Sequence, residues 1–425
     1  MPRAAEMPRS WHCTRVRAVI LAALTVLWVA LLLSPCTFDV PAQAATSDVA
    51  LRGALQRDLN AYLVERSEPE HISALSLSVD LPNSSASLDL ASGTTAIGGS
   101  TPVHSSELFD IGSNTKAFTA CVLLQLEAEG RLTIDQTVGR WLPQYPAWSG
   151  VTIRQLLNMT SGIPTYDNDP RMERAQATSI HRRWTDEMLV AFVDPLYGNA
   201  PGPTHGWLYS NTNYLLAGMI IERATGHTYA DEIEQRLIRP LGLANTFYSP
   251  NVYPAVLTDR LVSGYFFNSD AINRELKPLL GRDVRLMDMS WAGPAGGIIA
   301  TPRDVARWAR ALYTGKVLAP QQQRELEMMV SMKTGKPIQN ASAGDPTGFG
   351  LGVAQSVRPE LGTYWYYQGE TLGYRMIHVW LPKSQTAFAL GLNSQPPGAQ
   401  EAHVGSLLVK IYQDLVRNGA IQPNK

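Results

Sequence analysis

The spacing of hydrophobic and polar positions changes along the chain, and each change marks an expected element. Residues 49–65 carry apolar side chains at helical spacing, as at Leu51 and Leu55. Residues 72–81 then alternate between apolar and polar, and 87–90 repeats the alternation after a Pro-Asn-Ser turn. The pattern predicts a helix followed by two paired strands.

In the middle of the chain, the pattern of apolar residues predicts helices joined by Pro/Gly-rich loops. Near the end, it predicts short strands before a closing amphipathic helix. The expected helices are 118–129, 153–159, 213–225, 229–237 and 401–416, and the β-rich runs are 364–367, 376–380 and 386–392. Strands at both ends of the chain with a helical insert predict an α/β fold whose single sheet is built from both termini. We expect a discontinuous sheet domain, 45–115 plus 290–425, and a mainly helical domain, 116–289, with the functional cleft between them.

The first 44 residues show a different pattern. A pair of arginines precedes residues 18–33, which carry no charge, and the small-x-small sequence Ala42-Gln43-Ala44 follows. This predicts a signal peptide, 1–44, and a periplasmic or secreted protein that meets a membrane only through this segment if it is uncleaved. A membrane anchor is the alternative, but the apolar run is shorter than the roughly 20 residues that span a bilayer. Lipidation at Cys36 is a second alternative.

Composition narrows the class of protein. The chain has 425 residues, with 36 Lys and Arg against 37 Asp and Glu, a net charge of −1. Such a balance offers no basic face for nucleic acid, and ordinary Gly and Pro contents exclude collagen-like repeats. Of three cysteines, Cys13 and Cys36 would leave with the signal peptide. Cys121 then has no partner for an internal disulfide, and its apolar surroundings predict a buried thiol.

Several common chemical signatures are missing from the sequence. It contains no Gly-x-Ser-x-Gly, no His-Glu-x-x-His, no phosphate loop ending in Gly-Lys-Ser/Thr and no Gly-x-Gly-x-x-Gly after a strand. The eight histidines form no cluster with ligand spacing. We therefore expect no metal and no nucleotide cofactor.

A serine and a lysine three residues apart form the first chemical motif. Ser113 lies where a polar loop becomes a helical run, and Lys116 follows on the same helix face. A lysine that is held neutral could take the serine proton and create a nucleophile. The alternative is a capping serine beside a solvated lysine, because the tetrapeptide alone is a weak signal.

A tyrosine and an asparagine two residues apart form the second motif, on a loop before an expected helix. Tyr209 could be held partly ionised by a neighbouring ammonium and move protons to the leaving group and the hydrolytic water. Asn211 could hold Lys116 and donate to a substrate amide. The alternative is that both residues only close a turn.

Together these motifs resemble the penicillin-recognising serine hydrolases related to class C β-lactamases, D-alanyl-D-alanine carboxypeptidases, D-aminopeptidases and small esterases. The similarity covers about residues 72–395 and includes Phe109-Asp110-Ile111-Gly112-Ser113, Thr160-Ser161-Gly162-Ile163-Pro164, Tyr209-Ser210-Asn211, Pro240-Leu241-Gly242-Leu243 and Phe349-Gly350-Leu351-Gly352. The resemblance implies that Ser113 is the acylated nucleophile, Lys116 its base, Tyr209 the second acid/base and Asn211 a substrate-positioning amide. It also implies a β-lactamase-like antiparallel sheet flanked by helices, with an all-α second lobe.

The third motif of this family departs from its usual form. Relatives carry Lys-Thr-Gly or His-x-Gly on the strand beside the site, and the triplet aligned with it is Gln368-Gly369-Glu370. A substrate carboxylate would lose its cation here, and Glu370 would repel it if it faces the cleft. Arg375 either restores a cation or lies on the outer face of the strand. The N–H groups of Thr371 and Ser113 are expected to form the oxyanion hole.

These features predict a hydrolase that acts on a small-molecule or peptide substrate through an acyl-Ser113 intermediate. The leading hypothesis is a D-alanyl-D-alanine carboxypeptidase-like or other D-amino-acid peptidase acting on cell-wall peptides. A small-ester esterase or a weak class C-like β-lactamase is the alternative within the same chemistry. A catalytically silent penicillin-binding-like protein is the alternative outside it.

Overall fold

The computed structural model describes residues 42–82, 84, 86–197, 206–248, 253–398 and 401–424. The expected signal peptide, 1–44, lies outside these residues except for its last three, and so do Cys13 and Cys36. Residues Gln43–Lys425 form one compact unit. Across the described ranges, no helix has the length and apolar character needed to cross a membrane.

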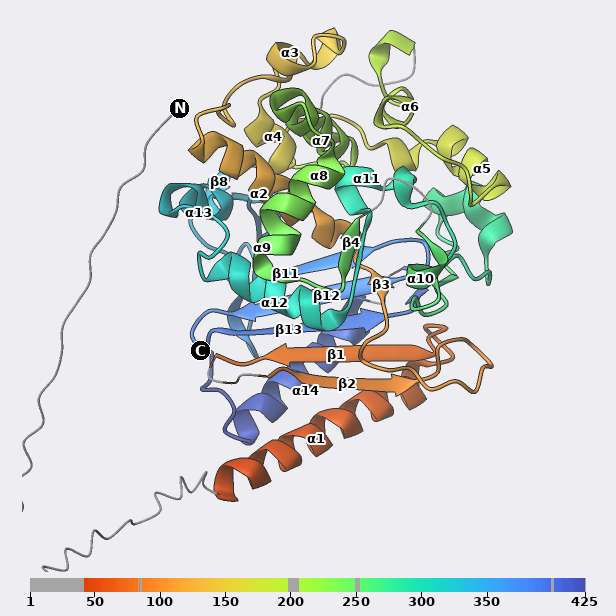
Figure 1. Ribbon diagram of the computed structural model, residues 1–425, viewed down its shortest axis with the longest axis vertical. Coiled ribbons are helices and arrows are strands. Elements are labelled where there is room, and N and C mark those ends of the chain that lie inside the picture. The colour runs from red at the N-terminus through yellow and green to blue at the C-terminus, as the bar shows by residue number, and fades with distance from the viewer. Residues whose placement is uncertain are drawn as a thin grey trace, which may run out of the picture. The chain divides into compact units, whose positions relative to one another are not determined.

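A nine-stranded antiparallel sheet runs through the molecule (Figure 1). Its strands follow the order β2 (Leu88–Gly93), β1 (Ala74–Asp80), β13 (Thr386–Leu392), β12 (Arg375–Leu381), β11 (Gly362–Glu370), β10 (Ala354–Arg358), β9 (Thr347–Phe349), β7 (Met329–Ser331) and β8 (Pro337–Ile338). The N-terminal strand β1 pairs with the C-terminal strand β13, with Leu75 opposite Leu392. The sheet is therefore built from both termini, which confirms the predicted fold class.

Helices cover both faces of this sheet (Figure 1). The terminal helices α1 (Ala42–Arg66) and α14 (Glu401–Arg417) pack on one face, where Leu59 and Leu407 share a hydrophobic core with Leu75. Helix α12 (Pro302–Tyr313) packs on the other face, against β1, β12 and β13. The rings of Trp308 on α12 and Phe118 stack with their centroids 3.8 Å apart, which joins α12 to the helical part of the chain.

The remaining helices lie mainly between residues 115 and 327. They are α2 (Thr115–Ala128), α3 (Val138–Trp141), α4 (Ile153–Leu157), α5 (Pro170–Thr178), α6 (Asp186–Val190), α7 (Thr212–Thr225), α8 (Tyr229–Ile233), α9 (Arg239–Leu241), α10 (Ala255–Thr258), α11 (Gly293–Gly296) and α13 (Pro320–Glu327). Short strands β3 (Phe109–Asp110), β6 (Ile298–Ala300) and β4 (Thr246–Tyr248) form a second sheet, and β14 (Ser394–Gln395) pairs with β5 (Tyr265–Phe266). The division into domains at residues 116 and 289 stays a prediction.

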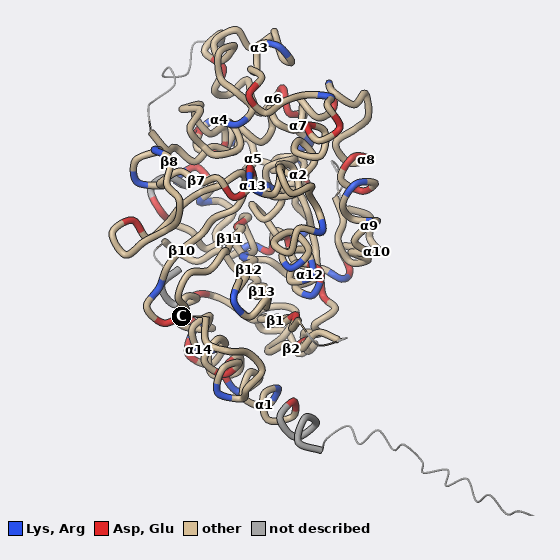
Figure 2. Tube along the Cα trace, turned by 90° about the vertical axis from the view of Figure 1, so that its left-hand side faces the viewer, with Lys and Arg blue, Asp and Glu red and all other residues tan. Residues whose placement is uncertain are grey.

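Local chemistry explains where several helices begin. Thr152 and Gln155 form a reciprocal capping box at the start of α4, and Thr301 accepts a hydrogen bond from the backbone N–H of Asp304 at the start of α12. Helix α7 ends at Gly226, whose φ of 78° suits glycine. Lys, Arg, Asp and Glu are interspersed along the described chain (Figure 2).

Candidate active site

Ser113 lies in a short 3₁₀ turn, Gly112–Asn114, directly before helix α2. Gly112 has a φ of 51°, a left-handed conformation that glycine adopts at low cost. A Cβ atom at Gly112 would lie 2.6 Å from both the backbone nitrogen and the backbone oxygen of Glu370. Glycine therefore allows the end of strand β11 to approach the serine loop.

The structure brings together four residues that the two sequence motifs identified. Ser113 Oγ lies 2.6 Å from Tyr209 Oη and 2.9 Å from Lys116 Nζ. Lys116 Nζ donates to Asn211 Oδ1 at 2.6 Å. Tyr209 and Asn211 reach the serine because they precede helix α7, which packs against α2. The interpretation of either pair as a simple cap or turn does not account for these contacts.

Lys116 is fully buried, and burial lowers the pKa of its ammonium to about 7. Its second acceptor is the backbone oxygen of Ala295, at 2.8 Å. A neutral lysine amine has two N–H donors and one lone pair. Asn211 Oδ1 and Ala295 O are acceptors only, so they engage the two N–H groups and leave the lone pair directed at Ser113 Oγ.

Tyr209 is a protonated phenol in this environment. Burial raises its pKa well above the ordinary value, and the hydrogen bond to Ser113 offsets only part of that rise. This shift opposes the expected partial ionisation of the phenol, although Lys116 Nζ lies 4.9 Å from the ring centroid. Of the two groups beside Ser113, Lys116 is suited to accept a proton and Tyr209 to donate one.

Asp167 is a site residue that the sequence motifs did not reveal. Asn211 Nδ2 donates to Asp167 Oδ2 at 2.7 Å, and Thr165 Oγ1 donates to Asp167 Oδ1. The first bond fixes which end of the Asn211 amide faces Lys116. The available signal was position alone, since Asp167 follows the family motif that ends at Pro164 by three residues.

The third motif, Gln368-Gly369-Glu370, contributes an amide side chain and a carboxylate side chain to the lining of a cavity beside Ser113. Gln368 Nε2 donates to Glu370 Oε1 at 2.6 Å, and Gln395 Nε2 donates to Glu370 Oε2 at 3.4 Å. Between them, Gly369 lies against the serine loop, where a Cβ atom would be 1.9 Å from the backbone oxygen of Ile111. Glu370 is thus held at the cavity by two glutamine amides.

The expected oxyanion donor at Thr371 is wrong. Its backbone N–H donates to the backbone oxygen of Tyr374 at 3.0 Å, within the β11–β12 turn. Because hydrogen-bonded and non-bonded pairs alternate along an antiparallel ladder, the next pair, Glu370 and Arg375, is a non-bonded one. The N–H of Glu370 therefore points away from β12, to the side where Gly112 lies, and it is the second donor available beside Ser113.

Arg375 does not restore a cation to the cleft. Its guanidinium is buried, donating to Glu70 Oε2 at 2.7 Å and to the backbone oxygen of Ser394 at 2.9 Å. Burial alone would raise the pKa of the Glu70 carboxyl, but Arg375 and the hydrogen bonds from Tyr62 and Arg66 hold that pKa below its ordinary value. Arg375 is neither in the cavity nor on an exposed face.

The residues around Ser113 and those of the third motif line a cavity of about 370 Å³. Ser113, Tyr209 and Asn211 line it together with two carboxylates, Asp167 and Glu370. None of the described residues that line it is Lys, Arg or His, because Lys116 is buried beneath Ser113. The cavity is therefore acidic and contains no cation to receive a carboxylate.

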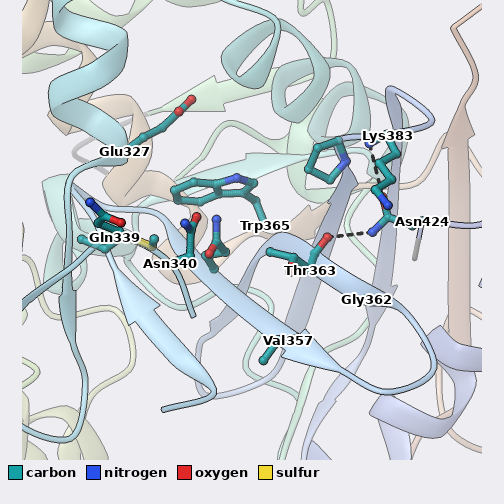
Figure 3. Close-up of a pocket in the computed structure, with 12 residues that line it drawn as sticks. Glu327, Gln339, Asn340, Val357, Gly362, Thr363, Trp365, Lys383 and Asn424 are labelled. Atoms are coloured by element: carbon teal, nitrogen blue, oxygen red, sulfur yellow. Dashed lines mark hydrogen bonds between the residues drawn. The ribbon is translucent and has the colours of Figure 1, made fainter. Parts of the chain in front are cut away.

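A larger cavity, of about 600 Å³, lies elsewhere on the sheet (Figure 3). Trp365, Asn340 and Lys383 are among its lining residues, and Asn424 Nδ2 donates to the backbone oxygen of Thr363. Its described lining contains no serine or cysteine. Among the described residues, no group of three or more His, Cys, Asp or Glu is arranged to hold a metal.

Cys121 is a free thiol with no exposed surface, as its apolar surroundings predicted. Burial raises the pKa of this thiol, which keeps it protonated and unreactive. It lies on helix α2 but takes no part in the contacts around Ser113.

An antiparallel sheet flanked by helices, with Ser-x-x-Lys and Tyr-x-Asn side chains meeting beside its strand β11, is the arrangement of the β-lactamase-like serine hydrolases. The Beta-lactamase family model matches residues 79–410, and the chain belongs to this family.

Relatives of known sequence support the same assignment. Penicillin-binding protein 4* of Bacillus subtilis is 29% identical over 279 residues, which cover 64% of this chain and 58% of that protein. Protein flp of Staphylococcus aureus is 30% identical over 210 residues, which cover 48% of this chain and 38% of that protein. The chain thus spans 58% of the length of the first relative and 38% of the length of the second.

Solved structures show the same fold. A D-stereospecific amidohydrolase from Streptomyces has 26% identity and a TM-score of 0.67, covering 85% of this chain and 97% of its own. The D-amino acid amidase of Ochrobactrum anthropi, in complex with D-phenylalanine, has 25% identity and a TM-score of 0.70, covering 86% and 99%.

Proposed function

We propose that this protein is a serine hydrolase that cleaves an amide or ester bond through an acyl-Ser113 intermediate. Lys116 takes the proton of Ser113 as Oγ attacks the carbonyl carbon. The backbone N–H groups of Ser113 and Glu370 donate to the oxyanion of the tetrahedral intermediate. When the bond to the leaving group breaks, Tyr209 supplies the departing atom with a proton, and the proton held by Lys116 replaces it. Water then hydrolyses the acyl ester.

The acidic cavity carries our proposal for the substrate. Two carboxylates, Asp167 and Glu370, face a space without a lining cation. A substrate ammonium gains a charge-assisted contact there, whereas a substrate carboxylate meets like charge. Such a contact contributes on the order of 1.5–3 kcal/mol, which is about tenfold or more in binding.

We therefore propose that the acyl part of the substrate carries a free amine, as in an amino acid amide or the N-terminal residue of a peptide. Within the D-amino-acid peptidase hypothesis, this favours an enzyme that recognises the amino end over a carboxypeptidase that recognises a C-terminal carboxylate. The D-stereospecific amidohydrolase and the D-amino acid amidase among the similar structures support D-configured substrates.

A panel of substrates tests this proposal. We expect D-phenylalaninamide to be hydrolysed with a kcat/KM at least tenfold above that of its N-acetyl derivative and above that of an N-acetylated D-Ala-D-Ala peptide. L-Phenylalaninamide tests the stereochemistry, p-nitrophenyl acetate tests the esterase alternative and a penicillin tests the β-lactamase alternative. Faster cleavage of the carboxylate-bearing peptide would refute the amine-recognition proposal.

The carboxylate of Glu370 offers a direct test of amine recognition. We expect Glu370→Gln to reduce the preference for D-phenylalaninamide over its N-acetyl derivative by about tenfold, because a neutral amide replaces the charged partner. The exposed Glu187 on α6 provides a matched control, and Glu187→Gln should leave the preference unchanged. An unchanged preference in Glu370→Gln would exclude this role for Glu370.

Mass spectrometry after exposure to a fluorophosphonate separates an enzyme from a catalytically silent protein. The reagent should modify Ser113 in the wild type and leave Ser113→Ala unmodified, because Lys116 activates this hydroxyl alone. An unmodified wild-type protein would favour the silent alternative.

We also propose that the protein is exported and that its first 44 residues are removed. The support is the sequence pattern of residues 18–33 followed by Ala42-Gln43-Ala44. N-terminal sequencing of the protein recovered from the periplasm or medium should begin at Ala45, whereas an intact N-terminus on a cytoplasmic protein would contradict export.

A further inference from the structure

A second cavity, of about 240 Å³, adjoins the active site at Tyr209. We call it the aromatic annex, and its walls are Trp207, Met332, Phe349, Ala354, Tyr366 and Tyr367. Tyr209 and Gln368 line both this annex and the acidic cavity around Ser113. The two cavities therefore adjoin at the side chains of Tyr209 and Gln368.

The annex is a preformed structure whose rings support one another. The Trp207 ring lies 6.3 Å from that of Tyr209 and 5.6 Å from that of Phe349, measured between centroids. Phe349 in turn packs edge-on against Tyr367 at 6.0 Å. Phe349 is on β9 and Tyr367 on β11, and Ala354 on β10 pairs with Phe349. Three neighbouring strands thus fix the walls.

The chemistry of the annex differs from that of the acidic cavity. No described residue of its wall carries a charge. The annex thus suits an aromatic or bulky apolar substituent.

The position of Tyr209 indicates which part of the substrate the annex takes. Its hydroxyl lies 2.6 Å from Ser113 Oγ and, under the proposed function, protonates the leaving group. A substituent on the leaving group passes this hydroxyl as it extends from the reacting carbon. The acyl part, with its ammonium, faces Asp167 and Glu370 in the other cavity.

We infer that the aromatic annex is a leaving-group subsite, and that the preferred substrates release an amine or a peptide that begins with an aromatic or bulky apolar group. This inference rests on the proposed function and narrows its substrate class. The annex is smaller than the roughly 300 Å³ of pockets that hold a whole drug-sized ligand, so it suits a single ring-sized substituent.

Substrates that share one acyl group and differ in the leaving group provide the test. The N-benzylamide and the N-methylamide of D-phenylalanine form the same acyl-enzyme, so their kcat/KM values differ only through binding and acylation. We expect the benzylamide to be favoured by roughly tenfold or more, since its ring leaves water for an apolar wall. Equal kcat/KM values would overturn the inference while leaving amide hydrolysis, and hence the proposed function, intact.

Filling the annex supplies the second arm of the test. We expect Ala354→Leu to bring the benzylamide-to-methylamide ratio close to one, because the larger side chain occupies the space for the ring. The exposed Ala255 on α10 lies outside the annex wall, and Ala255→Leu should keep the wild-type ratio. Labelling of Ser113 by a fluorophosphonate shows that each variant has folded. A wild-type ratio in correctly folded Ala354→Leu would contradict the subsite.

A binding measurement tests whether the annex is a subsite even if no amide is hydrolysed. N-Benzylacetamide is neutral and should slow fluorophosphonate labelling of wild-type Ser113 more than N-methylacetamide does, and this difference should disappear in Ala354→Leu. Failure of amide hydrolysis with this protection intact would refute the proposed function alone. Equal protection by both amides would refute the annex as a subsite.

Discussion

At the scale of single residues, the proton balance between Lys116 and its neighbours should be visible in the pH dependence of acylation. Burial lowers the pKa of Lys116 to about 7, and the Asp167 carboxylate acts in the opposite direction. The base form of Lys116 therefore gains population as pH rises through about 7. We expect the rate of Ser113 labelling by a fluorophosphonate to rise over the same interval.

Removing the opposing carboxylate should move this transition. In Asp167→Asn, the rise in labelling rate should shift to lower pH. The reason is that the Asp167 carboxylate no longer opposes the lowering of the Lys116 pKa by burial. Glu187→Gln is the control and should leave the rise at the same pH. A rise that stays at the same pH in Asp167→Asn would show that another group controls it.

Four of the residues that the structure brings together were predicted at this scale, because Ser113, Lys116, Tyr209 and Asn211 lie in motifs that resemble those of the serine hydrolase family. Asp167 has no such spacing, and only the fold reveals its bond to Asn211. The ionisation of Tyr209 depends on burial, which a sequence does not specify.

At the scale of elements, strand β11 lies so close to the serine loop that one methyl group should disturb catalysis. A Cβ atom at Gly369 would lie 1.9 Å from Ile111 O and 2.8 Å from Ser113 N. We expect Gly369→Ala to lower kcat/KM by about a hundredfold or more, as loss of an oxyanion donor does.

Gly344 supplies the matched control, because a Cβ atom there would meet no atom within 4 Å. Gly344→Ala should retain wild-type kinetics. Normal activity in Gly369→Ala would mean that β11 can move away from Ser113 without affecting the chemistry.

The buried ion pair between Arg375 on β12 and Glu70 after α1 links two elements that are distant in sequence. Arg375→Met should lower the free energy of unfolding by about 3–5 kcal/mol, because it leaves a buried carboxylate short of a partner. Denaturant unfolding measures this change. The double variant with Glu70→Gln should recover part of the loss, and a double variant no more stable than Arg375→Met would argue against an uncompensated charge as the cause.

Periodicity predicted the long elements well because each buries one face over many residues. The expected helix 213–225 is α7, Thr212–Thr225, and the expected strand 386–392 is β13. Strands β7, β8 and β9 have two or three residues each, too few to show alternation. The contact between β11 and the serine loop depends on strand register and turn geometry. The sequence alone therefore predicted the oxyanion donor at Thr371, one residue after Glu370.

At the scale of the whole molecule, the sheet separates two hydrophobic cores. Leu59 on α1 is fully buried in one core, and Leu215 on α7 is fully buried in the other. Leu59→Ala should lower the free energy of unfolding by about 2–5 kcal/mol without changing kcat/KM at temperatures where the protein is folded.

Leu215→Ala should be destabilising to a similar degree and should also reduce kcat/KM, since α7 carries Asn211 at its start. Unfolding curves and kinetics on the same samples distinguish the two effects. A loss of kcat/KM in folded Leu59→Ala would show that the two cores are coupled.

The pairing of β1 with β13 also determines when this molecule can fold during synthesis. Leu75 and Leu392 are neighbours in the sheet although the ribosome makes them more than 300 residues apart. The hairpin of β1 and β2 therefore emerges early and has no inner neighbour until nearly the whole chain has been made. Non-local pairing of this kind slows folding. Until its last strand closes the sheet, the unfolded chain is therefore exposed to aggregation and proteases for longer than a chain whose strands pair locally.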